Sequence, residues 1–208
     1  RRDYWIYYGI QMFIMMQYAD EYFPELKMTG NVANLKILKS YHFINLDFNQ
    51  QYNYLYMLMA RKNLDQALNE PKNRLIKFNE QIASKYRAGL SLKYLDSYVG
   101  SDIVHNTIKE YIQENQFFGT NSRQFETVLI KNSPKDIDWF FRTVIETRDL
   151  IDYKFGKVTK TEDSLSINII NKTNTNVPIS LYQLKDNQVV NKIWLTNIKT
   201  DSTIVIPR

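Results

Sequence analysis

The side chains that could do chemistry in this chain are few and lie far apart. There is no cysteine, and the two histidines, His42 and His105, stand in unrelated sequence contexts. A zinc site needs three or four nitrogen, sulfur or carboxylate ligands that converge on one point, usually with two of them one helical turn apart. Glu21 and Glu25 have that spacing, but no histidine lies near them in the sequence. The sequence therefore predicts that this chain binds neither a structural nor a catalytic zinc by itself.

The acidic pair Asp136 and Asp138 could pass for the paired carboxylates of an acid–base site. Just before the pair, Ser133 and Pro134 are typical of the first positions of a helix. At that place Asp136 would interact favourably with the helix dipole. Carboxylates two positions apart on a helix do not face each other. The start of a helix therefore explains these residues without catalysis.

Helical periodicity governs the first three quarters of the chain, and it predicts the elements that would position these residues. Apolar residues recur at spacings of three and four, as in Trp5, Tyr8 and Met12. On this basis we predict helices over residues 4–24, 51–66, 73–83, 87–99, 102–115, 122–131 and 135–147.

The pattern changes at Asp152 and Tyr153, after which apolar and polar residues alternate. Alternation predicts antiparallel strands from about residue 157 onward, and no helix longer than one turn. Asp186 and Asn187 are typical of a turn, and Pro178 should mark an edge or the start of a strand. We therefore predict an α+β chain, with a helical domain over residues 1–152 and a small antiparallel β-sandwich over residues 153–208.

The order of these segments resembles the C-terminal half of the catalytic domain in zinc aminopeptidases of the aminopeptidase N family, which are gluzincins. One matching motif is Tyr86-Arg87-Ala88-Gly89 at a helix start, followed by two helices and the run Asp136-Ile137-Asp138-Trp139-Phe140-Phe141. Upstream, the run Trp5-Ile6-Tyr7-Tyr8-Gly9 is similar to the segment that begins the helix carrying the family's third zinc ligand. The resemblance covers residues 4–24 and 84–155, and residues 25–83 have no counterpart in it.

The resemblance implies zinc-dependent hydrolysis of a peptide bond at a free N-terminus in the complete parent protein. It places Tyr86 where the family keeps a hydroxyl that stabilises the tetrahedral oxyanion, so Tyr86 is the candidate catalytic residue. The chain departs from the family because it lacks the His-Glu-x-x-His motif, and because Tyr8 occupies the position of the third zinc ligand. Ala88 stands at the lysine position of the tyrosine motif. We therefore expect this chain alone to be catalytically silent, with the Tyr86 hydroxyl pointing into the same cleft as Tyr8.

Two explanations, which do not exclude each other, fit these departures, and whether the protein is an enzyme stays open. In the first, the chain is the C-terminal portion of a longer metallopeptidase, and its partners are the missing N-terminal part and a peptide substrate. In the second, the protein is a pseudopeptidase that acts as a non-catalytic scaffold or binding component of a bacterial cell-envelope assembly. Tyr8 favours the second explanation, because the loss of one ligand cripples a zinc site.

Composition is that of a globular protein without a nucleic-acid or membrane-spanning role. The chain has 208 residues, of which 44% are hydrophobic, and a net charge of +5. Its basic residues are spread singly rather than clustered, which does not favour a nucleic-acid surface. The longest apolar stretch, Tyr4 to Met16, is shorter than the roughly 20 residues that a bilayer requires. The absence of cysteine fits several compartments, and the bacterial periplasm or cell envelope is kept as the working expectation.

Overall fold

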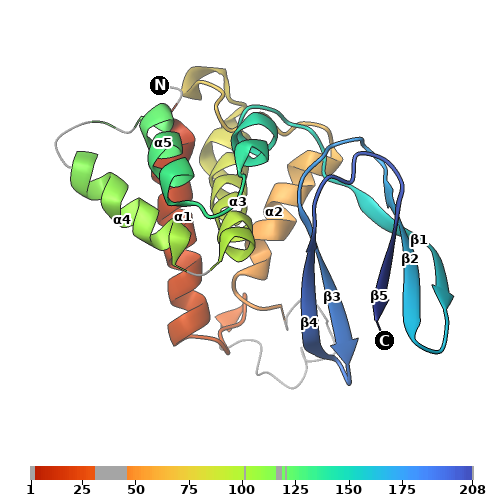
Figure 1. Cartoon of the computed structure of the whole chain (residues 1–208). Coiled ribbons are helices and arrows are strands. Elements are labelled where there is room, and N and C mark those ends of the chain that lie inside the picture. The colour runs from red at the N-terminus through yellow and green to blue at the C-terminus, as the bar shows by residue number, and fades with distance from the viewer. Residues whose placement is uncertain (1–2, 31–45, 101, 116–118, 120, 208) are drawn as a thin grey trace. The chain divides into compact units, whose positions relative to one another are not determined.

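The computed structural model describes residues 3–30, 46–100, 102–115, 119 and 121–207. The chain divides into two compact units (Figure 1). One comprises Arg1–Ile137 and Val144–Arg148 and is built from helices, and the other comprises Asp138–Thr143 and Asp149–Arg208 and holds the strands. The combination of helices with small antiparallel sheets confirms the predicted α+β class.

The helical unit follows the predicted order of helices. Its α-helices are α1 (Tyr4–Tyr22), α2 (Gln50–Arg61), α3 (Ser84–Val99), α4 (Ile103–Asn115) and α5 (Ser122–Asn132). The bounds of α1, α4 and α5 agree with the prediction to within two residues. By contrast, α2 ends five residues before the predicted end, because Asn63 adopts the left-handed conformation that commonly terminates a helix, with φ 55°.

The segment before α3 was predicted as a separate helix and is instead continuous with α3. A 3₁₀ turn, η3 (Lys72–Arg74), is followed by a π-helical turn, η4 (Asn79–Ala83), which leads directly into α3. The backbone N–H of Ser84 donates to the carbonyl of Asn79, five residues back, which is the hydrogen bond of a π-helix. The predicted break between residues 83 and 87 is therefore wrong.

The predicted helix over residues 135–147 begins later than the sequence indicates. The Ser133 hydroxyl donates to the Lys135 carbonyl at 2.8 Å and accepts from the Lys135 N–H at 3.3 Å, which makes a tight turn. Ser133 therefore follows the C-terminus of α5 instead of capping a new helix. Helical structure begins at Asp138 and includes the π-helical turn η5 (Phe140–Ile145).

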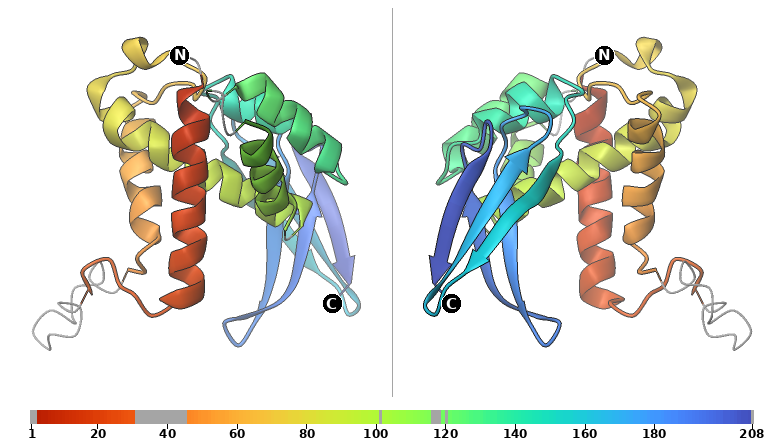
Figure 2. Two further views of the ribbon diagram at one scale, coloured as in Figure 1. Left: turned by 90° about the vertical axis from the view of Figure 1, so that its left-hand side faces the viewer. Right: turned by 90° about the vertical axis from the view of Figure 1, so that its right-hand side faces the viewer.

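The core of the helical unit lies between α1 and the helices that pack on it. Figure 2 shows α1 crossing α3, with α2 running antiparallel to α1. The largest buried side chains of this unit include Trp5, Phe13, Leu92, Leu95 and Phe125. Among the described residues, none of the helices has both the length and the apolar character needed to cross a membrane.

The strand unit contains two small antiparallel sheets. Strands β1 (Tyr153–Lys160), β2 (Ser164–Asn171) and β5 (Ser202–Pro207) form one sheet, and β3 (Ile179–Lys185) and β4 (Gln188–Leu195) form the other. Strand structure starts at Tyr153, four residues before the predicted start. The buried side chains of Ile167, Ile169 and Ile198 form a core cluster to which both sheets contribute.

The turns of the strand unit follow their sequence signals. Asp186 and Asn187 connect β3 and β4 with φ values of 52° and 62°, which is the conformation of a type I′ hairpin turn. Pro178 directly precedes β3, as predicted for a residue that cannot donate to a sheet.

Candidate functional site

The two segments that carry the family resemblance pack against each other. A Cβ atom on Gly9 of α1 would lie 3.1 Å from Cβ of Ala88 on α3, and one on Gly89 would lie 2.5 Å from Cβ of Met12. The two helices therefore approach as closely as small residues allow. This crossing fixes the candidate residues on both helices.

Tyr8, which the resemblance places at the third zinc ligand, lies half-buried among aromatic and basic side chains. Its ring centroid is 4.5 Å from that of Tyr4 and 4.9 Å from that of Tyr7. The ammonium of Lys85 lies 4.1 Å from the centroid of the Tyr8 ring, where the negative face of the ring attracts a cation. The same positive charge would repel a metal dication placed there. The surroundings of Tyr8 therefore suit an aromatic ring better than a metal ligand.

A hydrogen bond of Tyr4 connects the start of α1 to the π-helical turn η4. The Tyr4 hydroxyl donates this hydrogen bond of 2.6 Å to the main-chain carbonyl of Glu80. Burial, followed by the nearby Tyr8, raises the pKa of Tyr4 well above its ordinary value, so Tyr4 stays a neutral donor. Lys72 lies 5.6 Å from the centroid of the Tyr4 ring and pairs with the Glu80 carboxylate at 3.2 Å. These contacts make the beginning of α1 a cluster of tyrosines and lysines.

Tyr86, the candidate catalytic residue, lies half-buried on α3 against a different set of neighbours. Its ring centroid is 4.8 Å from that of Tyr52 on α2, and it packs against the cluster of Met12, Met16 and Tyr52. Burial, followed by the proximity of Tyr86, raises the pKa of Tyr52. The adjacent residue Lys85 contacts Tyr8, whereas Tyr86 contacts Tyr52. The shared cleft of Tyr8 and Tyr86 stays a prediction.

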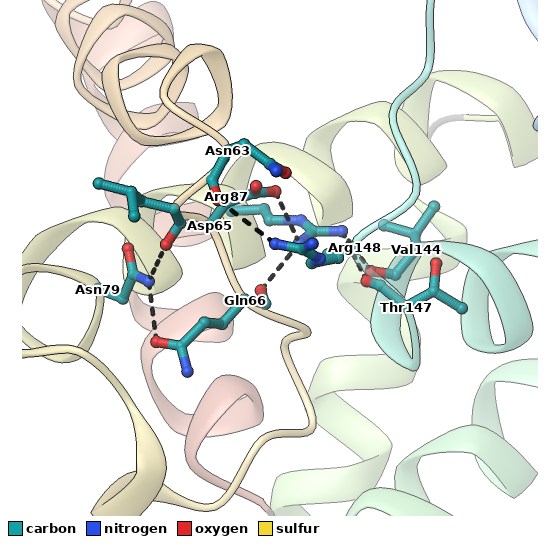
Figure 3. A network of polar contacts seen from close by, with 9 residues as sticks. Asn63, Asp65, Gln66, Asn79, Arg87, Val144, Thr147 and Arg148 are labelled. Atoms are coloured by element: carbon teal, nitrogen blue, oxygen red, sulfur yellow. Dashed lines mark hydrogen bonds and ion pairs between the residues drawn. The ribbon is translucent and has the colours of Figure 1, made fainter. Parts of the chain in front are cut away.

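Arg87 is the centre of a buried polar network that the sequence analysis did not identify (Figure 3). Its guanidinium donates to the carbonyl of Gln66 at 2.9 Å and to the carbonyls of Val144 and Thr147 at 3.1 and 3.0 Å. Asp65 supplies the counter-charge, with a carboxylate oxygen 3.6 Å from the guanidinium, and both side chains are buried. One side chain of α3 therefore holds two distant segments of the chain.

The network continues through amide side chains toward the π-helical turn. The Asn79 amide donates to the carbonyl of Leu64 at 2.8 Å and to the side-chain oxygen of Gln66 at 2.9 Å. The side-chain oxygen of Gln66 also accepts from the N–H of Ile76. The donors of this network are engaged by main-chain and side-chain oxygens, although one buried oxygen each of Asp65 and Asn79 has no hydrogen-bond partner among the described residues. Because its donors are used within the fold, the network is suited to support packing.

The position of Arg87 on its helix is the feature of the sequence that could have indicated this network. Arg87 shares the buried face of α3 with Ser84, Ser91 and Leu95, at offsets of three, four and eight residues. A buried arginine requires a counter-charge and several acceptors. The sequence does not show where those partners come from, because two of them are main-chain carbonyls near residue 145.

Both residues of the acidic pair considered from the sequence, Asp136 and Asp138, are exposed. Asp136 is exposed in the segment between α5 and the helical turn of Asp138. Asp138 is also exposed, and its carboxylate pairs with Arg142 one turn later, at 3.5 Å. The predicted place of Asp136 at a helix start is wrong, since helical structure begins two residues later.

The other residues considered as metal ligands, Glu21, Glu25 and His105, lie at the surface. Glu21 and Glu25 are exposed, the first near the end of α1 and the second beyond it, and His105 is exposed on α4. His42 lies outside the described residues. No group of three or more histidine, cysteine, aspartate or glutamate side chains is placed to hold a metal ion in the part of the chain that the structure describes.

Two comparisons with known proteins were negative. A scan against models of known protein families gives no match, and a search of curated proteins also gives none.

Proposed function

We propose that this chain is a peptidase-like module whose helical framework serves binding rather than hydrolysis. In this proposal the protein is a pseudopeptidase, related to the aminopeptidase N family, that acts as a scaffold or binding component. The observation that carries the proposal is the ammonium of Lys85, 4.1 Å from the ring of Tyr8. An aromatic ring and a fixed positive charge occupy the place where the resemblance expects an anionic zinc ligand, and such a charge disfavours a dication.

The residues next to Tyr86 support the same proposal. Ala88, at the lysine position of the motif, is fully buried and packs at the crossing of α1 and α3. The guanidinium of Arg87 is engaged by main-chain carbonyls and by Asp65. Neither residue of the motif thus presents a basic group to a substrate.

A second candidate function is favoured by the packing of α1 on α3. Gly9 and Gly89 bring into one core the two segments that resemble the family, which supports the likeness itself. Tyr86 is only half-buried, so its hydroxyl could serve a reaction whose zinc ligands come from a preceding part of the polypeptide. In that case the chain is the C-terminal portion of an aminopeptidase-N-like metallopeptidase that acts on peptides.

The substitution Tyr86→Phe in the complete protein distinguishes these functions. For a binding module, we expect neither the unaltered protein nor the variant to release the N-terminal residue of an aminoacyl anilide in the presence of zinc. Tyr52→Phe is the matched control, because Tyr52 belongs to the same cluster and lies outside the motif. The opposite result would be a zinc-dependent activity whose kcat falls by about 10²–10³ in Tyr86→Phe, with little change in KM, while the control has no effect. This result would contradict the proposal and support the second candidate.

A further inference from the structure

The face of α1 that points away from the core is apolar and exposed. Its side chains are Tyr7, Gln11, Ile14, Met15, Tyr18 and Tyr22, which we call the outer stripe. Apart from Gln11, these residues are 36% to 60% exposed. A helix that is apolar on all sides is normally buried on all sides. The outer stripe therefore has the character of a surface that a partner covers.

The spacing of the outer stripe is the same when it is read in either direction. Successive members are separated by four, three, one, three and four residues. An antiparallel second copy of α1 would therefore place Tyr7 near Tyr22, Gln11 near Tyr18, and Ile14 near Met15. Such self-complementarity is what a twofold interface between identical chains requires.

Both ends of the outer stripe carry clustered aromatic rings, but the charged side chains near the two ends differ. Tyr4, Tyr7 and Tyr8 are grouped at one end, and Tyr18, Tyr22 and Phe23 at the other. At the first end Lys85 lies over the Tyr8 ring, and Lys72, over the Tyr4 ring, pairs with Glu80. At the second end Glu21 and Glu25 are exposed, and Lys93 pairs with Asp20. An antiparallel pair brings Lys85 of each copy toward Glu21 and Glu25 of the other, whereas a parallel pair would bring like charges together.

We propose that α1 forms a twofold, antiparallel interface with α1 of a second copy of this chain. A membrane surface fits this face less well, because helices that bind membranes carry Lys and Arg on their polar face and α1 has neither. Tyrosine and methionine are enriched in protein interfaces, and charged residues are depleted from the interface core. The stripe offers on the order of 500 Å² of apolar area per copy, which predicts a weak dimer with micromolar affinity.

Cysteine cross-linking tests the interface and its direction, because the chain has no cysteine of its own. Near the twofold axis, Met15→Cys should cross-link to itself with a short bismaleimide. Tyr7→Cys alone should not cross-link, but a mixture of Tyr7→Cys and Tyr22→Cys should. Self-cross-linking of Tyr7→Cys would indicate a parallel pair and would overturn the proposed arrangement.

Sedimentation equilibrium of the full chain measures the association without a cross-linker. We expect a concentration-dependent dimer that Tyr18→Glu weakens by about 30-fold or more, since Tyr18 would face Gln11 of the second copy and occurs twice in the interface. Tyr54→Glu on α2 is the matched control, because Tyr54 is similarly exposed and lies outside the stripe. Circular dichroism should show that both variants keep their helices.

Three outcomes would overturn the proposal. The first is a chain that stays monomeric at concentrations well above the micromolar range. The second is a dimer that Tyr18→Glu and Tyr54→Glu weaken equally, which would place the interface elsewhere. The third is a monomer that binds phosphatidylserine vesicles through Tyr18, which would assign the stripe to a membrane surface.

Discussion

At the scale of single residues, Arg87 has the clearest structural role in the helical unit. A guanidinium has five N–H donors in a fixed plane, and here they meet carbonyls of two segments as well as the carboxylate of Asp65. Taking these charges out of water is costly, and the hydrogen bonds offset that cost only while all the partners are present. The network therefore makes the packing of α3 sensitive to one side chain.

Replacing Arg87 with methionine should lower the free energy of unfolding by about 3–5 kcal/mol, because Asp65 and the carbonyls would remain buried without their partner. Urea titration followed by circular dichroism measures this change. Arg148→Ala is the control, since Arg148 is exposed and makes a long hydrogen bond of 3.4 Å to the Asn63 carbonyl; its effect should stay within about 0.5 kcal/mol. Equal effects of the two substitutions would show that the buried network does not support the fold.

At the scale of elements, the crossing of α1 and α3 depends on small residues rather than on helix propensity. Glycine in the interior of a helix costs about 1 kcal/mol relative to alanine. At Gly89 that cost is offset by the close approach of Met12, since an added Cβ would lie 2.5 Å from the Met12 Cβ. At Gly9 the nearest atom is 3.1 Å away, so the constraint is looser.

The two glycines should therefore respond differently to alanine. Gly89→Ala should destabilise the helical unit by about 1–3 kcal/mol, because the crossing must open to admit the methyl group. Gly9→Ala should be nearly neutral, since the gain in helix propensity offsets a milder contact. Thermal unfolding of the two variants side by side measures the difference. A more stable Gly89→Ala protein would mean that the helices separate without cost.

The sequence predicted helix bounds well where the spacing of apolar residues determines them. It predicted them less well where contacts with distant segments determine where a helix begins. Spacings of three and four predicted α1, α4 and α5 closely, because one face of each is buried. The turn at Ser133 and the π-helical turn before α3 were missed, since their hydrogen bonds do not follow from the pattern. For Arg87, the sequence shows a charge on a buried face but not the carbonyls that it reaches. Tyr8 and Tyr86 were selected by resemblance, and only their packing neighbours are now known.

At the scale of the whole molecule, each of the two units has a core of its own. In the strand unit, the isoleucine cluster is closed at one end by polar contacts. The buried Asn171 amide donates to the carbonyls of Thr175 and Ile198 at 3.0 and 2.8 Å, and the Tyr153 hydroxyl donates to the Thr175 carbonyl at 2.7 Å. These bonds connect the end of β2 to the loops before β3 and β5.

Asn171→Ala should therefore weaken the strand unit selectively, by about 1–3 kcal/mol, because the carbonyls of Thr175 and Ile198 each lose one donor and must share the single Tyr153 hydroxyl. Native-state hydrogen exchange should show faster exchange of the amides in β2 and β5, with unchanged protection in α1 and α3. Asn191→Ala, at an exposed position of β4, is the control and should have little effect. Equal acceleration of exchange in α1 and α3 would show that the two units unfold as one.

The π-helical turn η4 has a consequence for the ancestry of the chain. A π-turn holds one residue more than an α-helix needs over the same length, so it is a place where a lineage can gain a residue without disturbing the helix beyond it. Here the extra residue falls where Asn79 reaches Leu64 and Gln66. A relative that is one residue shorter in this turn would keep α3 and its crossing with α1, but it would rotate everything before the turn by about 100°. Insertions and deletions among relatives should therefore collect at residues 79–83 and spare residues 84–99.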